Sequence, residues 1–324
     1  MKSILTSCLV LNVLMLFSQT TTLKLASDAW PPFTDVESKP AFALDLVSEA
    51  LTRTHVKSHT EILSFTEVIQ EIRNRKFDGS AALWYSPERA EFLLYSEPYL
   101  ENRLILVGKK GSNVNYNSLS ELNGKRIAVV ESYAYGDLVE GANNIVLVAG
   151  KSDQQNLERL LKGEADYMLV DALLIEYVLK NQSEESAKYL EIGANTMLKR
   201  TLHFAIRKDF PGADTIMQHF NKEIKKMIAD GAYNRILQLN WIATDVDGDG
   251  QTELVLSGDE AGTNEPVHSY MLMSTGGSSA SNSSRYFIEG NVYEDWERVP
   301  EKYKVQPTLV PNAQKSGFGP VFSF

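Results

Sequence analysis

A buried strand followed at once by a proline-marked turn is the feature that most constrains how this chain folds. Residues 79–83, Gly-Ser-Ala-Ala-Leu, form an apolar run, which is typical of a strand covered on both faces, as in a parallel sheet. Ser86 and Pro87 come next, ahead of Glu88 and Arg89. This order predicts a helix with Ser86 as N-cap and Pro87 in its first position. We therefore expect Arg89 to lie just past the carboxyl end of a buried strand.

Arg89 at such a place has two interpretations. Its planar guanidinium can hold a ligand carboxylate through two parallel hydrogen bonds, beside the backbone N–H groups of the helix start. Arg89 can also be a solvated residue that pairs with Glu88 or Glu91, and spacing alone does not decide between the two.

Charge and cysteine content narrow the class of partner. The chain has 324 residues, a formal net charge of -10 and one cysteine, Cys8. The acidic balance and the lack of a basic patch argue against nucleic acid or an anionic membrane surface as a partner. The length suits two lobes and an appendage. A single cysteine cannot form an internal disulfide, so cysteine usage does not indicate the compartment.

The N-terminus indicates export. Met1 and Lys2 give a short positive start, and residues 4–17 form a mostly apolar run that is too short to span a bilayer. These are the features of a signal peptide over residues 1–20, with cleavage near residues 18–21. We expect the mature protein to be soluble in the periplasm.

Three motifs in register extend the interpretation. Residues 76–79 read Lys-Phe-Asp-Gly, residues 86–91 read Ser-Pro-Glu-Arg-Ala-Glu, and residues 95–99 read Tyr-Ser-Glu-Pro-Tyr. Their order and spacing resemble the core signature of the family 3 solute-binding proteins, the periplasmic receptors that deliver polar amino acids to ABC importers. The resemblance covers about residues 22–241, including the closing segment 231–241. It places Arg89 at the family's ligand-carboxylate arginine.

The resemblance implies an α/β fold, a two-lobed periplasmic binding protein of type II with a hinge between the lobes. Residues 21–108 and 200–241 would form lobe 1 and residues 109–199 lobe 2. Residues 242–324 would form a small β-rich C-terminal extension.

The same resemblance implies a small zwitterionic ligand, an amino acid or a related compound, held between the lobes. Arg89 would bind its carboxylate and Asp171 its ammonium group, although Asp171 also suits the N-cap of a helix over residues 172–181. The predicted walls of the pocket are Trp30, Phe65, Trp84 and Tyr133. Trp84 and Tyr133 replace residues that are small and hydroxylic in the family, so two bulky rings would shrink the pocket or change the ligand class.

The extension carries one sharp motif, residues 245–253, Asp-Val-Asp-Gly-Asp-Gly-Gln-Thr-Glu. Oxygen atoms at alternate positions, with glycines that allow a tight bend, can surround Ca²⁺. An EF-hand would need an acid at its twelfth position, where Leu256 stands. The motif instead resembles the calcium loop of FG-GAP modules. The predicted ligands are Asp245, Asp247, Asp249 and Glu253; the alternative is a solvated acidic turn.

The sequence therefore predicts a monomeric binding protein with an ABC permease as partner and no catalytic residues. Two alternatives stay open. One is an enzyme resembling the periplasmic cyclohexadienyl dehydratases, for which Glu131 is the candidate acid. The other is a sensory or adaptor receptor of the same fold.

Overall fold

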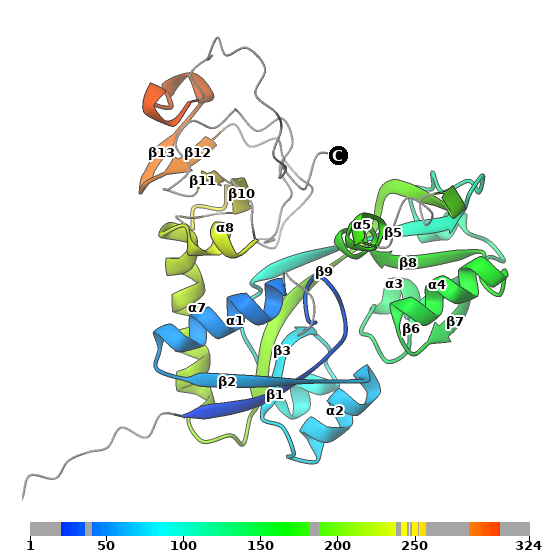
Figure 1. Cartoon of the computed structure of the whole chain (residues 1–324), viewed down its shortest axis with the longest axis horizontal. Helices are drawn as coiled ribbons and strands as arrows, with labels where there is room; N and C mark the ends of the chain where they lie inside the picture. Colours follow the sequence, from blue (N-terminus) through cyan, green and yellow to red (C-terminus); the bar gives the residue numbers. More distant parts are fainter. Residues whose placement is uncertain are drawn as a thin grey trace, which may run out of the picture.

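The computed structural model describes residues 21–35, 41–181, 188–237, 241–244, 246, 248–251, 253–256 and 285–304. Two α/β lobes share one mixed nine-stranded sheet, in the order β2-β1-β3-β9-β5-β8-β6-β7, with β4 paired to β9 beside this path (Figure 1). The strands are β1 (Thr22–Asp28), β2 (Lys57–Leu63), β3 (Gly79–Trp84), β4 (Leu93–Tyr95), β5 (Leu100–Lys109), β6 (Arg126–Val130), β7 (Val146–Gly150), β8 (Tyr167–Asp171) and β9 (Leu190–Arg207).

Two long antiparallel strands, β5 and β9, run from one lobe into the other (Figure 1). In lobe 1, β9 pairs with β3 and β4, and in lobe 2 β5 pairs with β8, where Leu104 lies opposite Asp171. The register between β5 and β9 shifts twice between Leu104 and Val107. The connection between the lobes is therefore a pair of strands, and the lobe boundaries expected from the sequence stay a prediction.

Lobe 1 is built from β1 to β4 and the helices α1 (Phe42–Arg53), α2 (Phe65–Arg73), α7 (Ala213–Ala229) and α8 (Ala232–Leu237). The apolar spacing of residues 42–55 predicts a helix, which is present as α1 and ends at Arg53; its buried side chains follow a helical period at residues 42, 43, 46, 47, 50 and 51. α2 begins at a capping box in which Ser64 and Glu67 satisfy each other's backbone N–H groups. The capping box fixes where α2 begins.

Lobe 2 contains β6, β7 and β8 with α3 (Asp137–Glu140), α4 (Asp153–Lys162) and α5 (Ala172–Asn181). Ser152 caps α4 by accepting a hydrogen bond from the N–H of Gln155, and Gly163 ends the helix with a φ of 79°. The predicted helix over residues 172–181 has the observed bounds of α5.

The helix expected to start at Ser86 is not an α-helix. A single 3-10 turn, η1 (Arg89–Glu91), stands in its place, and β4 begins two residues later. Pairing of β4 with β9 ends the turn, so a start signal in the sequence is outweighed by a strand that follows too soon. The apolar spacing of residues 66–76 also predicts a helix, which is present as α2 and ends at Arg73.

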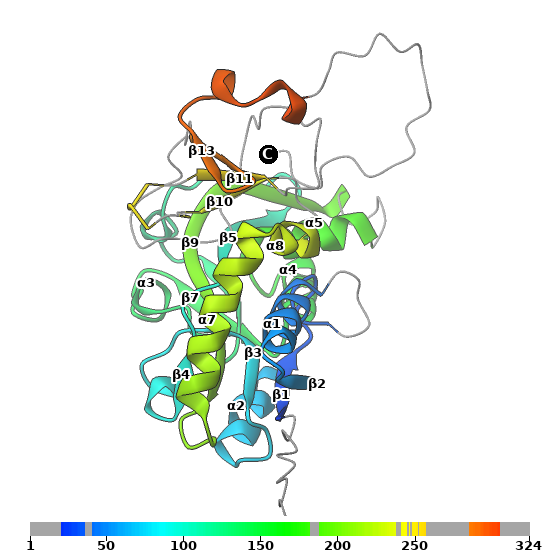
Figure 2. The same ribbon diagram turned by 90° about the vertical axis from the view of Figure 1, so that its left-hand side faces the viewer.

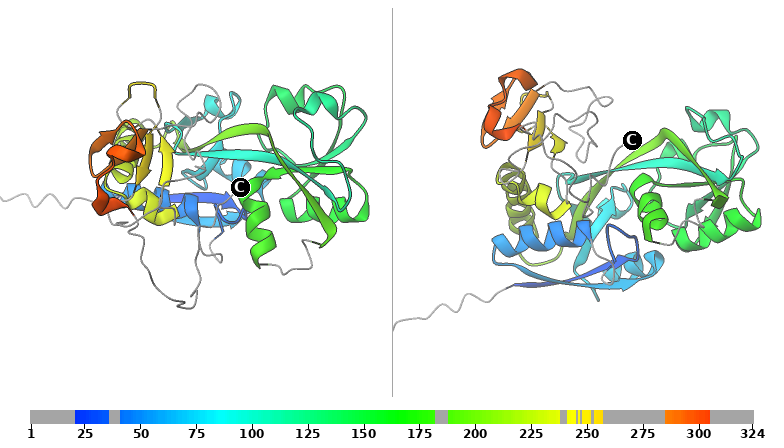
Figure 3. Two further views of the ribbon diagram at one scale, coloured as in Figure 1. Left: turned by 90° about the horizontal axis from the view of Figure 1, so that it is seen from above. Right: turned by 45° about the horizontal axis from the view of Figure 1, so that its top comes forward.

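The extension forms a four-stranded sheet of β10 (Trp241–Thr244), β11 (Glu253–Leu256), β12 (Arg285–Ile288) and β13 (Asn291–Tyr293), followed by the 3-10 turns η3 (Trp296–Arg298) and η4 (Glu301–Tyr303). It lies at the α8 end of lobe 1 (Figures 2 and 3). The buried Asn234 of α8 donates from Nδ2 to the carbonyl of Val255 at 3.0 Å, which ties the two together. Residues 269–273, whose sequence predicts a strand, lie outside the described residues, as does the predicted signal peptide.

Among the described residues, no helix has both the length and the apolar character needed to cross a bilayer. The remaining 3-10 turn, η2 (Leu119–Glu121), precedes β6.

Candidate functional site

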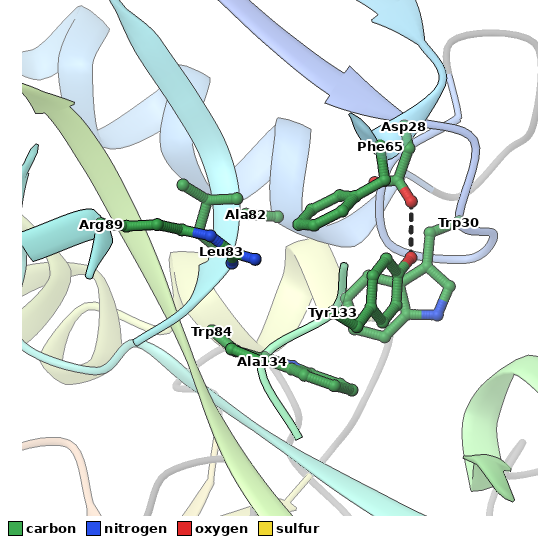
Figure 4. Close-up of a pocket in the computed structure, with 9 residues that line it drawn as sticks. All are labelled: Asp28, Trp30, Phe65, Ala82, Leu83, Trp84, Arg89, Tyr133 and Ala134. Carbon is green, nitrogen blue, oxygen red and sulfur yellow. Dashed lines mark hydrogen bonds between the residues drawn. The ribbon is translucent and has the colours of Figure 1, made fainter. Parts of the chain in front are cut away.

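A small cavity lies where the carboxyl ends of β1 and β3 in lobe 1 meet the loop after β6 in lobe 2. Its lining consists of Asp28, Trp30, Phe65, Ala82, Leu83, Trp84, Arg89, Tyr133 and Ala134 (Figure 4). Ligands of open α/β sheets bind at such strand ends. The space left between these side chains is about 10 Å³, close to the lower limit for a single buried water.

Arg89 enters the cavity from η1 and is 7% exposed. Its Nη2 donates a hydrogen bond to the carbonyl oxygen of Ser132 in lobe 2, and its Cζ lies 5.0 Å from the centre of the Phe65 ring. Nη1 is buried and has no hydrogen-bond partner among the described residues. Burial lowers the pKa of Arg89, yet a guanidinium stays charged at physiological pH. The second interpretation left open by the sequence, a solvated arginine, does not fit this burial.

Aromatic side chains line the cavity beside the Arg89 guanidinium (Figure 4). The ring of Tyr133 stands edge-on to Phe65, Trp84 and Trp30, with centroid distances of 4.6, 5.2 and 5.9 Å. Trp84 donates from Nε1 to Oδ1 of Asn102 at 2.8 Å, which fixes the indole at the base of the wall. The four aromatic residues expected from the sequence therefore lie together. Trp84 and Tyr133, the two that are bulkier than their family counterparts, are both part of the lining.

Asp28 lines the cavity and was not expected from the sequence. It accepts a hydrogen bond on Oδ2 from the Tyr133 hydroxyl at 2.5 Å, and burial raises its pKa to about 6. Its position at the carboxyl end of β1, two residues before Trp30, is the signal that could have identified it.

Asp171 is buried at the end of β8 but is not among the residues that line the cavity. Its Oδ1 accepts from the N–H of Leu173 at 2.8 Å, and its Oδ2 from the N–H of Arg103 at 3.1 Å. The helix-capping role is therefore present. The role at the ligand's ammonium group stays a prediction.

A third acid, Asp153, begins α4. Burial, followed by the charges of Asp28 and Asp171, raises its pKa to about 8; part of its surface still meets solvent. Burial also raises the pKa of Asp171, to about 7. Burial is the largest cause of the raised pKa in all three carboxyl groups, because it disfavours their charged form.

The sequence model of the bacterial extracellular solute-binding proteins, family 3, matches residues 23–243. The chain belongs to this family. Putative ABC transporter arginine-binding protein 2 of Escherichia coli strain K12 is 22% identical over 242 residues, 73% of this chain and 97% of that protein. L-cystine-binding protein TcyA of Bacillus subtilis strain 168 is 23% identical over 222 residues, 67% of this chain and 79% of that protein. Both are named as binding proteins.

Solved structures of family 3 relatives have the same two-lobed fold. An ancestral arginine-binding protein bound to arginine superposes with a TM-score of 0.57 at 25% identity, over 67% of this chain and 96% of that one. The match ends near the start of the extension, so the extension is an addition to the family 3 fold.

Glu131, the candidate acid of the enzyme alternative, is exposed and is not one of the residues that line the cavity. Family 3 relatives in the comparisons are binding proteins. The enzyme alternative is therefore not favoured.

Two residues of the acidic motif in the extension, Asp245 and Asp247, lie outside the described residues. Asp249 and Glu253 both pair with Nη1 of Arg285, each at 2.9 Å. Glu253 is fully buried, and its Oε2 accepts from the N–H of Val246 at 3.0 Å. In the part of the chain that the structure describes, no three His, Cys, Asp or Glu side chains are grouped as a metal site. An arginine supplies counter-charge to this loop, which the sequence did not indicate; the calcium site stays a prediction.

Proposed function

We propose that this protein is an extracytoplasmic receptor that captures an amino acid with a cationic side chain for an ABC importer. The observation that carries the proposal is Arg89, a buried guanidinium that faces the cavity with Nη1 unpaired among the described residues. A carboxylate is the ligand group that best satisfies such a fork, because two parallel hydrogen bonds match its geometry. Relatives named for arginine support this class of ligand, and the relative named for cystine supports an amino acid in general.

The cationic end of the ligand follows from Asp28. Its carboxyl group lies in the cavity beside the aromatic faces of Trp30 and Phe65, and its pKa is raised to about 6 by burial. A guanidinium or ammonium group at this position would pair with Asp28 and lie against aromatic faces, which attract cations. The cleft then holds an anionic group at Arg89 and a cationic group at Asp28.

Export, a permease partner and a monomeric state complete the proposal. They rest on the sequence features of residues 1–20 and on the family, since an importer's receptor must be exported and meet its permease. The native molecular mass in solution tests the monomeric state. The mass of the mature chain isolated from the periplasm tests export and cleavage of the signal peptide.

Calorimetric titration with arginine, lysine, glutamine and glutamate tests the ligand. Arginine should bind, and Arg89→Ala should weaken binding by roughly thirtyfold or more, the loss seen when one partner of a buried charge pair is truncated. Arg73→Ala is the matched control, since this arginine is in the same lobe and its side chain is 53% exposed. Equal affinity of wild type and Arg89→Ala would remove the carboxylate role of Arg89.

A further inference from the structure

The loop after β6 has an unfavourable backbone that something must hold in place. Ser132 has a φ of 64°, in the left-handed region that residues with a side chain rarely adopt. This conformation turns the Ser132 carbonyl toward Arg89 and places the Tyr133 ring in lobe 1. The loop is held in its own lobe, where the Tyr135 hydroxyl accepts from the N–H of Val130, and also by these contacts with lobe 1.

These contacts copy the two ends of the ligand proposed above. The carbonyl oxygen of Ser132 accepts from Nη2 of Arg89, as a ligand carboxylate would. The Tyr133 phenol fills the space between Phe65 and Trp84 and donates to Asp28, where the ligand's side chain would end.

We propose that Ser132 and Tyr133 are a built-in competitor of the ligand, which closes the cleft in the absence of ligand and sets which ligands can open it. This inference rests on the proposed function and deepens it. It also reverses the expected role of Tyr133, which becomes an occupant of the pocket that the ligand displaces, and not a wall against which the ligand packs.

The competitor is a neutral copy of a charged guest, which explains why it can be displaced. A carbonyl oxygen is a weaker partner for a guanidinium than a carboxylate, and it leaves Nη1 of Arg89 unpaired among the described residues. A phenol is likewise a weaker partner for the Asp28 carboxylate than a cation. A ligand with charge at both ends gains at both positions, whereas a neutral side chain gains only at Arg89.

Asp28 sets the ratio of affinities between such ligands, and the closed loop turns that difference into a threshold on affinity. The apparent dissociation constant is the intrinsic one divided by the fraction of molecules whose cleft is open. A loop that holds the cleft closed therefore raises the apparent dissociation constant of every ligand equally. Ligands that lack a cationic group to pair with Asp28 bind the open form more weakly. They are therefore the first whose apparent affinity becomes too low to be useful.

The experiment compares wild type with Tyr133→Ala and Tyr133→Phe, and with Tyr189→Ala as a control, because Tyr189 is 61% exposed and outside the cavity. The first measurement is the radius of gyration by X-ray scattering without and with arginine. Wild type should be compact in both states. Tyr133→Ala should be expanded without ligand and contract when arginine is added.

The second measurement is affinity for arginine by calorimetry. A competitor predicts tighter binding by Tyr133→Ala, by about tenfold if the loop leaves roughly one molecule in ten open. A wall predicts weaker binding, so weaker binding overturns the inference. Tyr133→Phe keeps the ring and loses only the bond to Asp28; it should fold as wild type does and gain less affinity.

The two measurements separate this inference from the proposed function. If no amino acid binds to any variant, the proposed function fails, and scattering of the ligand-free proteins still decides whether the loop closes the cleft. A wild type that is as expanded as Tyr133→Ala without ligand would overturn the competitor on its own.

Discussion

The hydroxyl of Tyr133 in lobe 2 donates a hydrogen bond to Oδ2 of Asp28 in lobe 1 at 2.5 Å. This bond joins the carboxyl end of β1 to the loop after β6, so one carboxyl group serves both closure of the cleft and its electrostatics. Asparagine separates the two roles, because its side-chain oxygen still accepts from Tyr133 while the charge is gone.

Asp28→Asn should therefore weaken binding of arginine by roughly thirtyfold or more, as expected when one member of a buried charge pair is removed. Binding of glutamine should change less than about threefold, since a neutral side chain forms no ion pair with Asp28. Calorimetry with both amino acids measures this, and Asp166→Asn on the surface of lobe 2 serves as control. Equal losses for both ligands would show that Asp28 does not read side-chain charge.

The free energy of unfolding of the ligand-free protein should fall as pH rises from about 5 to 8. This fall should be smaller in Asp153→Asn. Burial raises the pKa of Asp28 to about 6 and that of Asp153 to about 8. A raised pKa means that the folded state holds protons that the unfolded chain has lost, so the contribution is present at low pH and disappears as pH passes the folded value.

Urea unfolding at several pH values gives the free energy of unfolding of wild type and of Asp153→Asn. Subtracting the two removes the contribution of other acids, including those with lowered pKa values, because both proteins share them. Identical pH slopes for the two proteins would contradict the assignment. Binding of a cation should also release protons from these acids, visible as a dependence of the calorimetric enthalpy on the buffer used.

Tyr99, the last residue of the Tyr-Ser-Glu-Pro-Tyr motif, is a structural residue. It is fully buried, its hydroxyl donates to the carbonyl of Ala81 in β3 at 2.8 Å, and its own carbonyl accepts from the Tyr233 hydroxyl. Tyr99→Phe leaves a buried carbonyl unpaired and should lower the free energy of unfolding by about 1–2 kcal/mol. Tyr85→Phe, at a position 46% exposed, should change it by less than about 0.5 kcal/mol. A Tyr99→Phe protein as stable as wild type would refute this role.

Elements that depend on local patterns could be predicted from the sequence. The buried strand at residues 79–83 and the helix at residues 172–181 are both observed as expected. Both could be predicted because a run of apolar residues or a helical period can be recognised within a short segment of the sequence. The apolar run at residues 202–207 predicts a strand there, but β9 begins at Leu190. Its first twelve residues alternate irregularly between exposed and buried positions, so no period marks them as strand.

Features that depend on distant partners could not be predicted in the same way. The sequence indicated that Tyr133 is unusual, but its contact with Asp28 spans 105 residues and requires both lobes. The sequence around Arg89 predicted an α-helix, but Arg89 lies in a 3-10 turn. The pairing of β4 with β9, which ends this turn, depends on residues far away in the sequence. The sequence indicated Arg89 and the four aromatic residues that line the cavity, but it missed Asp28 and included Asp171, which is not part of the lining.

The acidic loop of the extension provides the last prediction. Asp249 and Glu253 share the guanidinium of Arg285, so a bound Ca²⁺ would compete with an internal cation for two of its predicted ligands. Ca²⁺ should still raise the melting temperature, because the motif offers two further aspartates and an oxygen-only ligand set suits this ion. Differential scanning fluorimetry with Ca²⁺, Mg²⁺ and a chelator measures the effect, and Asp249→Asn should reduce the response. No shift at millimolar Ca²⁺ would mean that Arg285 alone neutralises the loop.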